Sequence, residues 1–314
     1  MQFSIYFILI TFFLSPFHKQ QKWGFFGHRK INELAIYTLP PELGNFYKLH
    51  AEQLIELAVA PDQRRYIVKE EGAKHYIDLD RYDSLPLPKY WNEAVDVYGE
   101  ELLRSQGIVP WNTYFVYHRL VKAMSDKNYE RIVRLSADLG HYVADAHVPL
   151  HTTSNYNGQL TGQLGIHAFW ESRLPELYFE SYDLFAGRAA YVDDVQAELW
   201  ETVMESHTFV DSVLTLEASI THKVGEDKKY AHIIKGKRSV RVPSEYFCKE
   251  YNQQGGGLVE QRMRQAIVRV GSLWLSAWVD AGMPVLGSGE GLAIESPDSA
   301  KYEPVISGLR SHDY

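Results

Sequence analysis

The sequence predicts an all-α fold built as a single multi-helix domain. Apolar residues recur at helical spacing in six segments of the chain. Strand signals are scarce, because no sustained run of alternating β-branched residues is bounded by Asn-Gly turns. The chain has 314 residues, of which 45% are hydrophobic, and this is enough for a substantial core. We therefore expect helices that pack on one another rather than on a sheet.

The first two predicted helices end at prolines. One covers residues 28–39 and stops at Pro40-Pro41, and the next covers residues 43–60 and stops before Pro61. Proline lacks the N–H that an interior helix position needs. The other helical patterns cover residues 111–125, 129–146, 192–218 and 258–281.

Three segments are predicted to be loops because they are rich in turn-forming residues. They are residues 83–88, 152–165 and 238–257, the last being mostly loop. The helices and these loops together predict one domain over residues 23–284. Residues 285–314 have turn residues and little periodicity, so we expect an irregular tail.

The N-terminal segment resembles the hydrophobic region of a signal peptide. Residues 3–17 are almost wholly apolar, which is short for a membrane span of about 20 residues. We predict a signal peptide over residues 1–20 and export to the periplasm or the cell exterior. The single cysteine, Cys248, excludes a cysteine-based zinc knuckle within this chain.

The net charge argues against a protein that grips duplex nucleic acid. The chain carries −8 at pH 7, whereas a protein that neutralises many duplex phosphates is usually basic. We therefore predict no duplex-binding face. An enzyme that acts on a phosphate ester is still compatible with this charge, because bound metal would offset it locally.

The segment from His141 to Glu171 carries the most informative pattern. Two pairs, His141/Asp145 and His167/Glu171, stand at i,i+4, a spacing that points both side chains of a pair to the same side of a helix. Between the pairs, a proline two residues before His151 ends a helix and lets this histidine fold back. Imidazole and carboxylate groups without cysteine suit zinc.

The N-terminal part offers three more potential ligands, His28, Asp62 and His75. Eight side chains are too many for one tetrahedral zinc and suit two or three, with Asp145 as a bridge between a close pair. Zinc lowers the pKa of bound water to about 7 and stabilises charge on phosphoryl oxygens. Arg65, three residues after Asp62, could clamp a phosphate oxygen with its planar guanidinium.

Each of these residues also has a simpler interpretation. A single His/Asp pair at i,i+4 is commonly a salt bridge, and Arg65 beside Arg64 and Lys69 is typical of a solvated basic face. His147 is expected to pack or to form a hydrogen bond near the site. His207, although four residues before an aspartate, is expected at the surface because no second pair lies near it.

The ordered set of motifs resembles one superfamily, that of the zinc-dependent phospholipases C and the single-strand-specific nucleases with 3′-nucleotidase activity. The matching stretches are Trp23-Gly24, Gly27-His28, Pro61-Asp62, His75-Tyr76-Ile77-Asp78, Gly140-His141 with Asp145, Pro149-Leu150-His151, and His167 with Trp170-Glu171. They run in the family's order over about 150 residues, which is a far stronger signal than any one motif.

The resemblance implies three zinc ions and a role for each matched residue. Asp62, His75, His141 and Asp145 would hold the first ion. Trp23, His28 and Asp145 would hold its close partner, and His151, His167 and Glu171 would hold the third. Asp62 would also orient the attacking water. Arg65 stands where the nuclease branch has a basic residue near the substrate phosphate.

We therefore predict a zinc-dependent hydrolase of phosphate esters. The predicted substrate is either a phospholipid head group, which would involve transient contact with a membrane surface, or a nucleotide or single-stranded nucleic acid. Glu171 and the lack of disulfides favour the phospholipase branch, whereas Arg65 favours the nuclease branch. Aromatic residues that lie close to ligands in the sequence suit either use; they are Phe25, Phe26, Tyr76, Tyr156 and Phe169.

The alternative is a zinc-binding surface or interaction protein of the same fold without catalytic activity. An HD-type phosphohydrolase has little support, because the only adjacent His-Asp pair is His312-Asp313, in the predicted tail. The sequence carries no signal for an oligomeric state.

Overall fold

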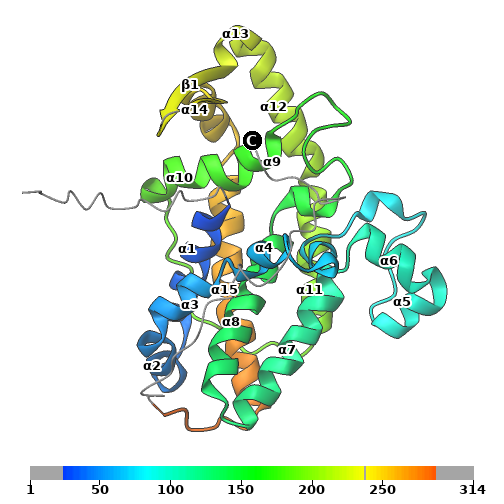
Figure 1. Cartoon of the computed structure of the whole chain (residues 1–314), viewed down its shortest axis with the longest axis vertical. Coiled ribbons are helices and arrows are strands. Elements are labelled where there is room, and N and C mark those ends of the chain that lie inside the picture. The colour runs from blue at the N-terminus through cyan, green and yellow to red at the C-terminus, as the bar shows by residue number, and fades with distance from the viewer. Residues whose placement is uncertain (1–23, 237, 288–314) are drawn as a thin grey trace, which may run out of the picture.

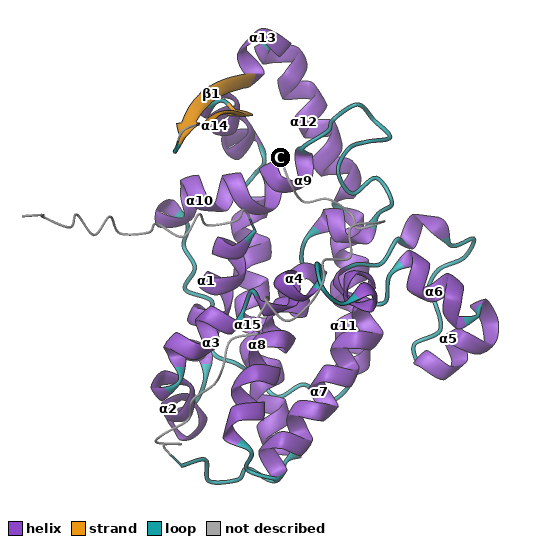
Figure 2. Cartoon of the chain, viewed as in Figure 1, coloured by secondary structure: helices purple, strands orange, loops and turns teal. Residues whose placement is uncertain are grey.

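The computed structural model describes residues 24–236 and 238–287. Helices dominate these residues, and the strands form one short hairpin (Figures 1 and 2). The prediction of an all-α fold is therefore confirmed. Three predicted features lie outside the described residues: the signal peptide over residues 1–20, the metal ligand at Trp23, and most of the irregular tail.

The helices follow one another along the chain with short connections. Their bounds are α1 Phe25–Ala35, α2 Pro41–Leu49, α3 Ala51–Leu57, α4 Ala60–Arg64, α5 Trp91–Tyr98, α6 Glu100–Gln106, α7 Val109–Ser125, α8 Tyr129–Ala146, α9 Ile166–Ala168, α10 Leu174–Tyr178, α11 Val195–Thr208, α12 Val210–Val224, α13 Glu226–Lys229, α14 Glu245–Gln254 and α15 Leu258–Asp280. Short 3-10 turns cover Ile36–Thr38, Lys69–His75, Leu79–Arg81, Pro149–Thr152 and Phe179–Ser181, and a π-helical turn covers Phe169–Arg173.

Two of the predicted helices are broken in the structure. The pattern over residues 43–60 divides at His50 into α2 and α3, and the pattern over residues 192–218 divides at Phe209 into α11 and α12. At both breaks the backbone N–H bonds back three residues, from His50 to Tyr47 and from Phe209 to Ser206, so the helix tightens and restarts. Apolar periodicity continues through such a turn and does not reveal it.

The prediction of a mostly irregular segment over residues 238–257 is wrong. Strands β1 Tyr230–Lys235 and β2 Arg238–Pro243 pair antiparallel, from Tyr230 opposite Pro243 to Lys235 opposite Arg238. Helix α14 follows, and its N-terminus is capped by the Ser244 side chain, which accepts from the Phe247 N–H at 3.2 Å. The alternation in β2 is too short to register as a strand in the sequence.

Helix α8 runs through the middle of the helical body, where it contacts α1, α7 and α15 (Figure 1). Tyr47 and Trp274 stack in this core with ring centroids 4.7 Å apart. Helix α1 approaches α8 closely at Gly140, where an added Cβ would lie 2.2 Å from Asn32 Oδ1. The missing side chain at Gly140 thus lets α1 bring its polar residues next to those of α8. Among the described residues, no helix is both long and apolar enough to cross a membrane.

Candidate metal centre

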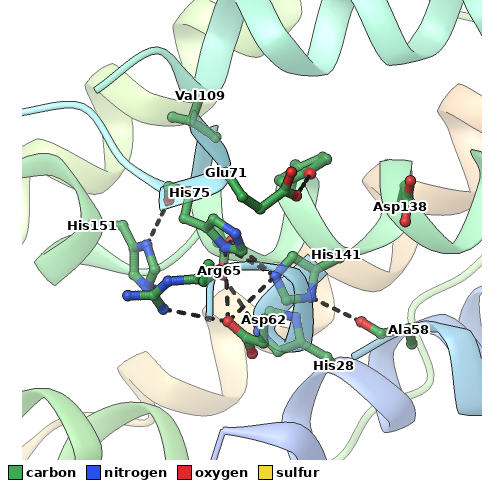
Figure 3. Close-up of polar contacts among 12 residues, drawn as sticks. His28, Ala58, Asp62, Arg65, Glu71, His75, Val109, Asp138, His141 and His151 are labelled. Carbon is green, nitrogen blue, oxygen red and sulfur yellow. Dashed lines mark hydrogen bonds and ion pairs between the residues drawn. The ribbon is translucent and has the colours of Figure 1, made fainter. Parts of the chain in front are cut away.

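The eight predicted imidazole and carboxylate ligands among the described residues converge, although six separate parts of the chain supply them. Helix α1 carries His28, α4 carries Asp62, and the 3-10 turn that follows ends at His75. The other five come from α8, from the turn Pro149–Thr152, and from α9 with the π-helical turn. Figure 3 shows His28, Asp62, His75, His141 and His151 directed toward one another.

The first group contains Asp62, His75, His141 and Asp145. His75 Nδ1 lies 2.9 Å from Asp145 Oδ2 and 3.1 Å from His141 Nε2, and His141 Nε2 lies 3.3 Å from Asp145 Oδ2. Asp62 Oδ1 completes the group at 3.8 Å from His75 Nδ1 and 3.9 Å from His141 Nε2. Asp62, His75 and His141 therefore offer one atom each to a common point, and Asp145 Oδ2 lies beside the two histidines.

The second group lies beside the first and shares Asp145. His28 Nε2 is 3.4 Å from Asp145 Oδ1, the carboxylate oxygen that the first group does not use. The His28 ring stacks on the His141 ring with centroids 3.9 Å apart. Asp145 thus presents one oxygen to each group, as expected for a bridging carboxylate.

The third group contains His151, His167 and Glu171. Glu171 Oε2 lies 2.8 Å from His167 Nε2 and 3.5 Å from His151 Nε2. His151 Nε2 is also 3.8 Å from Asp145 Oδ1, so the third group adjoins the other two.

Backbone carbonyls orient three of the histidines. The Nδ1–H groups of His141, His151 and His167 donate to the carbonyl oxygens of Ala58, His75 and Tyr156, at 2.8, 2.6 and 3.0 Å. Each ring therefore directs its Nε2 lone pair inward, which is the arrangement that metal-binding histidines commonly show. The Nδ1 of His28, by contrast, is buried without a hydrogen-bond partner among the described residues, and stacking on His141 orients its ring.

These distances fit zinc. The ligand atoms of a tetrahedral zinc, each about 2.0–2.1 Å from the ion, lie about 3.3–3.4 Å from one another. The contacts in the three groups range from 2.8 Å to 3.9 Å, and several are longer than a good hydrogen bond. Three carboxylates gathered with five imidazoles also form the oxygen and nitrogen donor set that zinc accepts.

The three neighbouring carboxylates of the centre also favour bound cations. Burial raises the pKa of Asp145 to about 7, although His151 and His28 oppose that shift. Burial also tends to raise the pKa values of Asp62 and Glu171, but neighbouring groups outweigh it and lower both, chiefly His141 for Asp62 and hydrogen bonds from His151 and His167 for Glu171. Carboxylates in such proximity cannot all be ionised without positive charge between them.

Comparison with known families shows to which family the chain belongs. The sequence profile described as S1/P1 Nuclease matches residues 23–280. This chain belongs to the S1/P1 nuclease family. The predicted superfamily, which includes the single-strand-specific nucleases, is thereby confirmed. The alternative of a non-catalytic zinc-binding protein is not favoured. Zinc dependence is a property of this family, and the donor groups described above suit it.

Two solved structures are similar to this chain in part. One is the alpha-toxin of Clostridium perfringens from an avian strain, with 11% identity, a TM-score of 0.48, and coverage of 83% of this chain and 65% of the toxin. The other is the alpha-toxin of Clostridium absonum, with 13% identity, a TM-score of 0.44, and coverage of 80% and 64%. The chain thus spans less than two thirds of either toxin. No curated protein matches the chain.

In this S1/P1 family member, Arg65 lies inside the centre. Its side chain is mostly buried, and its Nη1 is 3.4 Å from Asp62 Oδ1 (Figure 3). The interpretation of Arg65 as part of a solvated basic face is therefore wrong. A guanidinium held beside one of the donor carboxylates is well placed to bind an anion.

A buried polar network behind the first group was not expected from the sequence. Arg64 pairs with Asp138 at 3.0 Å and with Glu71 at 3.1 Å, and it also donates to the Tyr142 hydroxyl at 3.3 Å. Tyr142 donates to Glu71, and Lys74 Nζ lies 2.7 Å from the other oxygen of Glu71. Glu71 is only 1% exposed. We refer to these five residues as the Arg64 network.

The Arg64 network connects the three segments that supply the first group. Arg64 ends α4, which carries Asp62, and Glu71 lies in the turn that ends at His75. Tyr142 lies on α8, and its ring contacts the His75 ring edge-on at 5.4 Å. The network therefore fixes the relative positions of these segments without contributing a ligand.

Polar side chains from inside and outside the predicted loop over residues 152–165 hold this loop in place. The Ser154 N–H and hydroxyl donate to the two oxygens of Asp80 at 2.7 and 2.6 Å. Asn157 Oδ1 accepts from the N–H groups of Gly165 and His167 at the start of α9. Asp80 and Asn157 thus hold the segment that separates His151 from His167, and no spacing in the sequence pointed to them.

The remaining predictions have mixed outcomes. His147 is buried and donates to the Val143 carbonyl at 2.7 Å, as expected for a packing residue. His207 is half-buried and its Nδ1 lies 3.0 Å from the Thr152 carbonyl oxygen, so it is at the surface only in part. Phe169 packs against Phe247 in the interior and cannot serve as an open aromatic platform.

Proposed function

We propose that this protein is an exported nuclease that binds three zinc ions and cleaves single-stranded nucleic acid and 3′-nucleotides. The convergence of the eight donor side chains into three adjoining groups is the observation that carries the proposal. Membership of the S1/P1 nuclease family favours nucleic acid over a phospholipid head group as the substrate.

The first ion would be held by Asp62, His75, His141 and Asp145. The second would be held by His28 and Asp145, with Trp23 as a further ligand, and the third by His151, His167 and Glu171. Bound zinc supplies a water of lowered pKa and neutralises charge on the phosphoryl oxygens.

Two side chains of the protein act on the substrate directly in this proposal. Asp62 accepts a hydrogen bond from the attacking water and so aligns it with the phosphorus. Arg65 binds a phosphoryl oxygen through its guanidinium, which Asp62 already holds at 3.4 Å. Because Arg65 is mostly buried beside the donor groups, its charge acts in a less screened environment than a surface arginine would.

Aromatic side chains near the centre supply surfaces on which bases can stack. Tyr156 lies with its ring 6.2 Å from the His167 ring, and Tyr76 follows His75 directly. Tyr66 follows Arg65 and is 37% exposed, although the sequence pattern did not single it out. Splayed bases of a single strand can use such platforms, whereas stacked bases of a duplex cannot.

The test is hydrolysis by the purified, zinc-loaded protein of three substrates: single-stranded DNA, 3′-AMP and phosphatidylcholine vesicles. We expect cleavage of the first two and none of the third. Duplex DNA of the same sequence serves as the matched control and should be cleaved far more slowly. Cleavage of phosphatidylcholine alone would overturn the nuclease proposal, and cleavage of none of the substrates would overturn the hydrolytic function.

A further inference from the structure

The carboxylate of Glu171 lies between two groups of donors. Its Oε2 faces the third group, at 2.8 Å from His167 Nε2 and 3.5 Å from His151 Nε2. Its Oε1 lies 3.4 Å from His28 Nε2, which belongs to the second group. Each oxygen of this one side chain is therefore directed at a different set of histidines.

We propose that Glu171 is a second bridging ligand of the centre. Its Oε2 serves the third ion, and its Oε1 serves the second ion together with His28 and Asp145, beside the proposed ligand Trp23. The resemblance in sequence implied only the first of these roles. This proposal rests on the zinc centre of the proposed function, and it does not depend on which phosphate ester is cleaved.

The distances around His28 support this assignment. His28 Nε2 lies 3.4 Å from Asp145 Oδ1 and 3.4 Å from Glu171 Oε1. Both values equal the separation of about 3.3–3.4 Å between ligand atoms on a tetrahedral zinc, and both are long for a hydrogen bond. Three donors from three segments thus surround the second ion, and none of them is Trp23.

The backbone around Glu171 places it for this role. Glu171 lies in the π-helical turn Phe169–Arg173, a rare geometry that is frequent at functional sites. The start of α1 packs against this turn, because a Cβ at Gly27 would lie 3.7 Å from the Glu171 carbonyl oxygen and a Cβ at Gly24 would lie 3.7 Å from Oε1. The approach of Glu171 to His28 therefore follows from helix packing rather than from a long side chain reaching across solvent.

Two double variants distinguish a bridging Glu171 from one that serves the third group alone. They combine Glu171→Asp with His28→Ala or with His167→Ala. Aspartate is one methylene shorter, so we expect it to keep the contact with His167, one helical turn away at 2.8 Å, and to lose the longer one with His28 at 3.4 Å. In the His28→Ala background, where the second ion is already lost, Glu171→Asp should remove no further zinc. In the His167→Ala background, where the third ion is already lost, Glu171→Asp should remove one more zinc per chain.

The measurement is zinc per chain, by mass spectrometry of the metal after dialysis at fixed free zinc, with far-UV circular dichroism of every variant. If the double variants behave the other way round, Glu171 serves the third ion only and the proposal is wrong. Should an aspartate variant fail to fold, Glu171→Gln replaces it, since the amide keeps the length but offers a single ligating oxygen. A folded wild-type chain that binds no zinc would overturn the proposed function as well, so the two failures are distinguishable.

Discussion

Replacing Glu71 with glutamine removes the central charge of the Arg64 network. Glu71 is 1% exposed and accepts from Arg64 at 3.1 Å, from Lys74 at 2.7 Å and from the Tyr142 hydroxyl. The change keeps the size of the side chain but leaves the two cations with one fewer anion. We expect the protein to lose stability and the first donor group to loosen, because its three segments meet at this network.

The size of the expected stability loss follows from the burial of the Arg64–Glu71 ion pair. Removing one partner of a fully buried ion pair costs about 3–5 kcal/mol of unfolding free energy. The Arg64 side chain is 24% exposed and keeps its contact with Asp138 at 3.0 Å, so we expect a loss of about 3 kcal/mol, at the low end of that range. Urea unfolding of the metal-free protein at pH 7 measures it. The control is Glu130→Gln, which breaks an exposed pair with Arg134 and should cost less than about 0.5 kcal/mol.

The loss should also depend on pH with a defined sign. Burial alone would raise the pKa of Glu71, but Arg64 and Lys74 outweigh it and lower the pKa. A lowered pKa in the folded state stabilises the protein above the pKa of an unfolded glutamate, about 4.3, and this contribution disappears as the pH falls through the folded value. The difference between wild type and Glu71→Gln should therefore shrink below about pH 4. A difference under about 1 kcal/mol at pH 7, or one that is constant from pH 7 to pH 3, would refute the reasoning.

Three further predictions concern the packing and the chemistry of the centre. Gly140→Ala should destabilise the protein by about 1–3 kcal/mol and reduce zinc retention, because the new Cβ would lie 2.2 Å from Asn32 Oδ1. Thermal unfolding and metal analysis test this prediction. A variant equal to wild type in both measurements would contradict it. Arg65→Ala should lower kcat/KM on 3′-AMP about 100-fold with zinc content unchanged, and loss of zinc in this variant would instead make Arg65 a structural residue. Asp80→Asn should lower the free energy of unfolding by about 1–2 kcal/mol, because it weakens the hydrogen bonds from Ser154. Proteolysis within residues 152–165 should also become faster. An unchanged proteolysis rate would count against this prediction.

Two pairs of the donor set were predictable from the sequence because their spacing is local, whereas His28, Asp62 and His75 were assigned through the resemblance. His141 with Asp145 and His167 with Glu171 stand at i,i+4, and helical geometry alone aims both members of each pair at one point. The pattern over residues 129–146 also matches the bounds of α8. Where a long amphipathic helix carries the ligands, periodicity predicts both the helix and the direction of its side chains.

The Arg64 network was not predictable because its members are distant in the sequence. Glu71 and Asp138 belong to separate segments and meet only through Arg64. Nothing in the spacing of single charged residues distinguishes such a pair from two solvated ones. For the same reason, the bridge from Glu171 to His28 appears only once α1 is placed against the π-helical turn.

The hairpin and α14 were missed for a different reason. Strand β2 has six residues, with Val240 and Val242 as its alternating apolar positions, and such a short pattern does not stand out from a loop. The breaks within the predicted helices over residues 43–60 and 192–218 arise from single tightened turns that leave apolar periodicity intact. The signal peptide, the role of Trp23 and the domain limits at residues 23 and 284 stay predictions.

The central claim is that the converging donor groups hold zinc and that this zinc is required for phosphate-ester hydrolysis. The most direct test is to strip the purified protein with a chelator and to follow hydrolysis of 3′-AMP while zinc is added back in known amounts. We predict no activity in the stripped protein and full recovery when three zinc ions per chain are bound. Undiminished hydrolysis of 3′-AMP after complete removal of the metal would contradict the account. So would a return of full activity while the chain binds no zinc.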